Sequence, residues 1–166
     1  YIGMYVNAPP LDDRNLRIAV NYAFDKNTFA DEYLEGSRIP ARGIIPPGFP
    51  SFNPYLDTYA YDPEKARRLV KDSKYGSDLN SLPRITLNVG SVGGSTGFYG
   101  MGAIQRAWEE ELGFVVDIQH TPWDTFLESL HATRYQMFEV GWGADYPDPE
   151  NFLDILFHSN SKNCLL

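Results

Sequence analysis

The chain has 166 residues and a formal net charge of −8, with 14 Lys and Arg against 22 Asp and Glu. Nucleic-acid and anionic-membrane partners are disfavoured, because both are bound through clusters of Lys and Arg that this sequence lacks. No apolar run approaches the ~20 residues that span a bilayer, and Tyr1 to Pro10 does not have the basic-then-apolar layout of a signal peptide. The length predicts one compact domain.

The first part of the chain predicts a strand followed by two helices. Residues 1–6 are apolar and rich in strand-forming residues, and they are followed by a turn with two prolines. Apolar residues then recur at helical spacing from Asp12 to Phe24. A second, shorter helix over residues 29–34 is expected to end at Gly36.

Proline defines the next two features. Between residues 39 and 54 the prolines are too frequent for a helix or a central strand, so we expect an ordered loop that packs through its apolar side chains. A helix is predicted to begin at Asp62 and Pro63, because aspartate is a preferred N-cap residue and proline fits the first helical position.

From residue 84 onward the pattern alternates between strand and helix, which predicts an α/β fold with helices packed against a sheet. Thr121 to Asp124 has the spacing of a capping box and predicts the start of one of these helices. The expected elements are a strand at 85–89, a helix at 104–112 closed by Gly113, a strand at 114–119, a helix after Thr121, a strand at 135–142 and a helix after Asp148.

Several chemistries are disfavoured by missing motifs. The Gly90–Gly97 segment follows a strand, but it lacks both the P-loop Lys-Ser/Thr and the G-x-G-x-x-G spacing, which favours a surface or cleft-rim loop over a phosphate site. His120, His131 and His158 show no zinc-ligand spacing, and the single cysteine, Cys164, allows no internal disulfide. We therefore expect no metal, no cofactor and no catalytic residue.

The most informative segment is Gly141–Pro149, which follows a predicted strand, where ligands bind in open α/β sheets. Trp142 lies between two glycines, Gly141 and Gly143, which would allow a ligand backbone to approach closely. Asp145 lies beside Tyr146, and a carboxylate next to aromatic rings suits an ammonium group. A structural alternative, in which Asp145 forms an Asx-turn and Trp142 is a core residue, is equally consistent with the residue types.

Two other interpretations of these acids fit the sequence less well. Asp145, Asp148, Glu150 and Asp154 do not have the spacing of a calcium loop, and Asp148 and Asp154 are better explained as a helix cap and an exposed helix position. A carboxylate-dependent hydrolase, directed at a glycan or a peptide, needs a second acid that nothing in the sequence singles out. The G-x-S-x-G signature of esterases is absent.

The order of segments resembles the family 5 extracellular solute-binding proteins of bacteria, the oligopeptide, dipeptide and nickel receptors of ABC importers. The resemblance covers essentially the whole chain in collinear order. It is carried by Asn7–Asp13, Arg17–Lys26, Gly36, Pro40–Gly43, Tyr61–Ala66 and Gly141–Phe152.

This resemblance implies one lobe of a type II periplasmic-binding-protein fold, with a mixed sheet and packed helices. Residues 1–166 would form most of the C-terminal lobe of a two-lobed receptor, with residues 1–6 as a strand near the hinge. By motif position, Asp145 would receive the amino terminus of a peptide. Trp142, Gly143 and Tyr146 would line the same pocket.

The resemblance also implies partners and a location. The protein would be a monomeric, extracytoplasmic receptor, in the periplasm or lipid-anchored on the outer face of the membrane, and it would deliver a peptide or similar amine-bearing solute to an ABC permease. Some peptide-binding relatives hold the ligand carboxylate with arginines, whereas Leu130 and Glu139 occupy the nearby positions here. Nickel complexes, opines and sugars are therefore alternative ligands.

Overall fold

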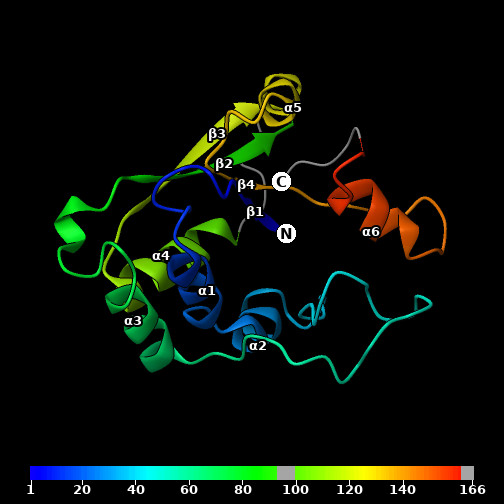
Figure 1. Ribbon diagram of the computed structural model, residues 1–166. Coiled ribbons are helices and arrows are strands. Elements are labelled where there is room, and N and C mark those ends of the chain that lie inside the picture. The colour runs from blue at the N-terminus through cyan, green and yellow to red at the C-terminus, as the bar shows by residue number, and fades with distance from the viewer. Residues whose placement is uncertain (93–99, 162–166) are drawn as a thin grey trace. The chain divides into compact units, whose positions relative to one another are not determined.

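The computed structural model describes residues 1–92 and 100–161 (Figure 1). Residues 93–97 of the predicted glycine-rich loop, and Cys164, lie outside this part of the chain. The elements, in order, are β1 (Ile2–Met4), α1 (Arg14–Tyr22), α2 (Lys26–Thr28), the π-helical turn η1 (Phe29–Tyr33), α3 (Pro63–Lys71), the 3₁₀ turn η2 (Leu79–Ser81), β2 (Ile85–Ser91), α4 (Met101–Leu112), β3 (Val116–Pro122), α5 (Trp123–His131), β4 (Met137–Glu139) and α6 (Glu150–Phe157).

The chain divides into two compact units, each built from two separate stretches of sequence. Tyr1–Asp25 and Ala60–Val140 form the sheet unit, which contains all four strands. Lys26–Tyr59 and Gly141–Leu166 form the loop unit, which contains the proline-rich segment and α6.

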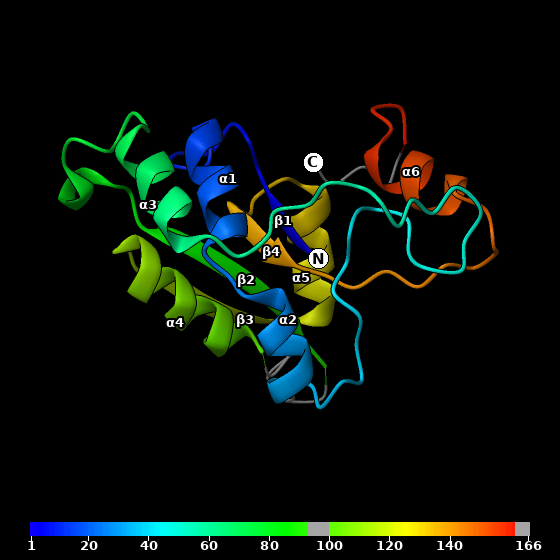
Figure 2. The same ribbon diagram turned by 90° about the horizontal axis from the view of Figure 1, so that it is seen from below.

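The sheet is mixed, with the strand order β1-β4-β2-β3. β2 pairs in parallel with both β3 and β4, whereas β1 pairs antiparallel to β4 at one edge. The two crossovers, β2–α4–β3 and β3–α5–β4, run in opposite directions along the sheet. Because parallel crossovers are almost always right-handed, this reversal places α4 and α5 on opposite faces. Figure 1 shows this arrangement, and Figure 2 views the face covered by α1, α3 and α4.

The core of the sheet unit lies between the sheet and these three helices. The fully buried residues Leu87, Val89 and Met137 line this face of the sheet. Trp108 of α4 is also buried, and its indole N–H donates to the Val20 carbonyl of α1 over 2.9 Å. That hydrogen bond satisfies the only polar atom of the Trp108 side chain, so the ring can be buried at no cost in unpaired donors.

Local signals predicted several helix ends correctly. The Asp62 carboxylate accepts a 2.8 Å hydrogen bond from the Lys65 amide at the start of α3, and Gly113 ends α4 in the left-handed conformation at φ +74°. Helix α1 begins slightly later than predicted, because Asp13 rather than Asp12 is its N-cap. Asp12 instead forms an ion pair with Lys74.

Other boundaries were wrong for a common reason, which is strand pairing. Thr121 does not cap α5: it lies inside β3, where it is paired with Gly90, and the N-cap position of α5 is Pro122, which makes no side-chain cap bond. The predicted strand at 135–142 is reduced to Met137–Glu139, after which Val140 makes one further backbone bond to Tyr1.

The loop unit has little regular structure. The predicted short helix is the α2–η1 segment, and residues 39–54 form the expected irregular loop without helix or strand. This loop packs through Phe49, which meets the ring of Phe152 on α6 edge-on at 5.1 Å between centroids. Within the described ranges, no helix is long and apolar enough to cross a membrane.

Candidate functional site

The site predicted from sequence is the loop between β4 and α6, in the loop unit. Trp142 is fixed near its start, because the indole N–H donates a 3.0 Å hydrogen bond to Oδ1 of Asn151 in the first turn of α6. Asn151 is completely buried, whereas Trp142 keeps 38% of its surface exposed. The ring is therefore held on one edge and still presents surface to solvent.

A second bond joins the far side of the loop to α6. The Tyr146 hydroxyl donates to the Glu150 carboxylate, and this bond raises the pKa of the Tyr146 phenol. The backbone between them turns tightly, since the Asp148 amide donates to the Tyr146 carbonyl over 2.9 Å. The Asp148 carboxylate in turn accepts from the Glu150 amide over 2.9 Å, but it is not the predicted cap, because Pro149 occupies the N-cap position of α6.

Asp145 lies between these two anchored aromatic residues and is exposed. Across residues 1–92 and 100–161, no hydrogen bond or ion pair involves its carboxylate. An Asx-turn, the structural alternative for this residue, would require the carboxylate to accept a nearby backbone N–H. The structure does not show that bond, so the carboxylate is left available.

The glycines beside Trp142 leave space. A Cβ atom added at Gly141 or at Gly143 would meet no atom within 4 Å, and neither residue has the positive φ that favours glycine. Neither glycine is thus required by local packing or by backbone conformation. Their absence of side chains keeps the backbone of this loop accessible.

The structure brings Trp142, Gly143, Asp145 and Tyr146 together on one loop, but it also adds two residues that sequence reasoning missed. Asn151 and Glu150 are the side chains that hold the loop on α6. The available signal for Asn151 was its helical spacing from the apolar residues Ile155 and Leu156, since a polar residue on the apolar face of a helix needs a partner.

The histidines and the other possible metal ligands do not form a second site in the described part of the chain. The Nδ1 atom of His131 lies 2.8 Å from the Leu127 carbonyl of its own helix, and that of His158 accepts from the Asn160 amide over 3.2 Å. Within the part of the chain that the structure describes, no group of three or more His, Cys, Asp or Glu side chains is arranged to hold a metal ion.

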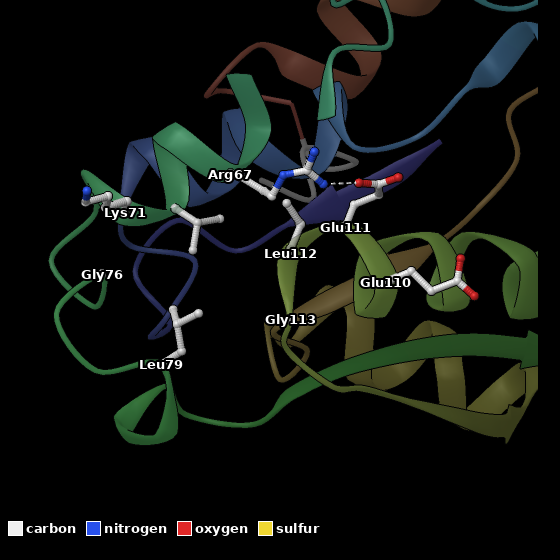
Figure 3. Close-up of a pocket in the computed structure, with 9 residues that line it drawn as sticks. Arg67, Lys71, Gly76, Leu79, Glu110, Glu111, Leu112 and Gly113 are labelled. Atoms are coloured by element: carbon white, nitrogen blue, oxygen red, sulfur yellow. Dashed lines mark hydrogen bonds and ion pairs between the residues drawn. The ribbon is translucent and has the colours of Figure 1, made fainter. Parts of the chain in front are cut away.

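A pocket of about 370 Å³ lies in the sheet unit, between the ends of α3 and α4 (Figure 3). Its rim carries the Arg67–Glu111 ion pair, and Leu79 and Leu112 line it. Figure 3 shows Glu110 pointing away from this pair. Helix α4 ends here just before β3 begins, so the pocket lies at the amino ends of the parallel strands and far from the end where ligands bind in such sheets.

The whole sequence was compared with the models of known protein families to find the family to which the chain belongs. The model of the bacterial extracellular solute-binding proteins, family 5 Middle, matches residues 1–164. The chain belongs to this family. The resemblance read from the sequence is thereby confirmed.

Two relatives of this chain carry peptide-binding names. The oligopeptide-binding protein OppA of Bacillus subtilis is 28% identical over 162 residues, which cover 94% of this chain and 29% of the relative. A probable di/tripeptide-binding protein 5 of Pseudomonas aeruginosa is 31% identical over 153 residues, covering 92% and 28%. Both names describe binding proteins, so the hydrolase alternative gains no support.

A solved structure shows the same fold. The periplasmic oligopeptide-binding protein OppAIV of Borrelia burgdorferi superposes with a TM-score of 0.81 at 26% identity, covering 99% of this chain and 31% of that one. The predicted α/β fold, with a mixed sheet like that of a periplasmic binding protein, is confirmed. The chain spans less than a third of the length of these relatives.

Proposed function

We propose that the protein containing this chain is the solute-binding component of an ABC importer, and that residues 1–166 form most of the C-terminal lobe of a two-lobed receptor. The family match and the peptide-binding names of the relatives support this proposal, as does the share of their length that the chain covers. The receptor acts outside the cytoplasm and is not an enzyme. It captures its ligand between lobes, and the closed form is recognised by the membrane permease.

The ligand is a peptide or a similar amine-bearing solute, and Asp145 binds its ammonium group. One observation carries this assignment: an exposed carboxylate, with no partner among residues 1–92 and 100–161, lies between Trp142 and Tyr146, both of which are anchored to α6. A carboxylate forms strong charge-assisted hydrogen bonds with an ammonium, and aromatic faces attract the same cation. Gly143 adds room for the ligand backbone.

The test is calorimetric titration of the full-length receptor with a short peptide and with its N-acetylated form. Asp145→Asn should lower the affinity for the free-amine peptide about 10- to 100-fold, since hydrogen bonds to charged groups contribute about 1.5–3 kcal/mol. N-acetylation should cause a similar loss in the unmodified receptor and little further loss in the variant. Unchanged affinity of Asp145→Asn would show that this carboxylate does not bind the ligand.

Asp148→Asn is a matched control for this experiment. It removes the same charge three residues away, and the asparagine Oδ1 can accept from the Glu150 amide as the carboxylate does, so that bond is kept. We expect its affinity to equal that of the unmodified receptor. An equal loss in both variants would mean that net charge, and not the Asp145 site, governs binding.

A further inference from the structure

Glu139, the last residue of β4, places a carboxylate on a face of the sheet that is otherwise apolar. In the β2–β4 register Leu87 lies beside Met137, and Val89 lies beside Glu139. Side chains two residues apart on a strand share a face, so Glu139 points to the same side as Met137. Leu87, Val89 and Met137 are fully buried, and Glu139 is half-buried at the end of this row.

In the described part of the chain, no side chain of opposite charge pairs with the Glu139 carboxylate. Among the residues described, none forms a hydrogen bond or ion pair with it. Burial raises the pKa of Glu139, and only the α-amino group of Tyr1 acts in the opposite direction. By contrast, Lys74 and Arg84 lower the pKa values of Asp12 and Asp117, the acids with which they pair.

Glu139 lies at the end of the sheet where ligands bind in open α/β folds. β2 and β4 are parallel, and Glu139 is the last residue of β4. It pairs with Val89, two residues before the end of β2 at Ser91. Ligands of open α/β sheets bind beyond the carboxyl ends of the strands. A half-buried charge is costly unless something pairs with it, and a ligand bound at this end of the sheet can supply the missing cation.

We propose that Glu139 contacts a cationic group of the ligand, so that the receptor prefers solutes with a basic side chain over uncharged solutes of the same shape. This inference rests on the proposed receptor function and specifies its ligand class. An ammonium or guanidinium would complete the hydrogen bonding of the carboxylate. An uncharged ligand would leave the carboxylate desolvated without a partner, and a ligand carboxylate at this position would be repelled, which makes Glu139 a specificity-determining residue.

The experiment compares peptides that differ only in one charge. The full-length receptor is titrated with pairs of tripeptides that carry lysine or its uncharged analogue norleucine at the same position, each position in turn. The unmodified receptor should bind at least one lysine peptide about 10- to 100-fold more tightly than its norleucine partner, and Glu139→Gln should abolish that preference. Glu128→Gln, which removes an exposed charge from α5 of the same unit, should keep it.

Different results overturn different conclusions. Equal affinities for every lysine and norleucine pair, with Asp145→Asn still weakening both, would refute the role of Glu139 and leave the receptor function intact. A Glu139→Gln variant that unfolds at a lower temperature without ligand, but keeps the lysine preference, would show that the carboxylate pairs within the protein and would also refute it. Binding of no peptide at all would overturn the receptor function together with this inference.

Discussion

Replacing Trp142 with Phe removes the one N–H that satisfies Asn151. The Asn151 side chain is completely buried, and its Nδ2 atom already has no partner among the described residues, so Trp142→Phe leaves both ends of the amide unpaired. A buried acceptor that loses its partner costs about 1–3 kcal/mol. Asn151→Leu should cost less, because Trp142 is 38% exposed and water can accept its indole proton. In the double variant both groups are apolar, so the penalty of Trp142→Phe should shrink by about 1–3 kcal/mol.

The four proteins of this double-mutant cycle are compared by urea unfolding followed by circular dichroism. Loss of indole volume occurs in both backgrounds and therefore cancels in the cycle, which isolates the hydrogen bond. Coincident transitions at two wavelengths are needed before free energies of unfolding are calculated. If the two substitutions are additive within about 0.5 kcal/mol, Asn151 does not anchor the ring and the reasoning fails.

Three further outcomes are expected. Asp13→Ala should lower the free energy of unfolding by about 0.5–2 kcal/mol, because it removes the α1 cap and the bond that Asp13 Oδ2 accepts from the Lys74 amide. Asp13→Asn should restore only part of this loss, since its Oδ1 can cap α1 but its Nδ2 cannot accept from Lys74; equal losses in urea unfolding would contradict this. Burial raises the pKa of Glu139, so folding favours its protonated form, and the free-energy cost of its charge is complete once the pH has risen through its folded-state pKa. Glu139→Gln should therefore stabilise the protein at pH 7 and lose this advantage below about pH 4, where the carboxyl group is protonated in both states. The measurement is the unfolding temperature as a function of pH. Gly90→Ala should destabilise by about 1–3 kcal/mol, because its Cβ would lie 2.5 Å from the Trp123 ring, whereas Gly102→Ala, with its nearest atom at 3.7 Å, should be neutral or stabilising in the same assay.

Sequence patterns predicted best those elements whose ends are fixed by local chemistry. The Asp62–Pro63 start and the Gly113 end depend on backbone groups within a few residues, so the sequence signal and the observed bond are the same interaction. The Thr121 capping box failed because its threonine is committed to pairing with Gly90, 31 positions earlier in the numbering. Partners at that distance are fixed by the fold of the whole sheet unit, and no local pattern reports them.

In the candidate site, too, some features follow from local sequence and others depend on how the chain folds. The position of Trp142, Asp145 and Tyr146 between a strand and a helix could be predicted from the α/β pattern, and their role in ligand binding stays a prediction. The roles of Asn151 and Glu150 could not be predicted, since each depends on the path by which the loop returns to α6. An exposed acid and a paired acid look identical in the sequence, so it was the structure that distinguished Asp145 from Glu150.

The pairing of β1 with β4 sets an order of events during synthesis of the protein. The Tyr1 amino nitrogen and the Val140 carbonyl, which are hydrogen-bonded, are 139 positions apart in the chain. At ribosomal rates of about 5–20 residues per second, β1 waits roughly 7 to 28 s before β4 has been made. β1 is only three residues long, too short to template aggregation while it waits. Of the four strands in this sheet, β1 is therefore made before the others but finds its partner only after β4 has been made.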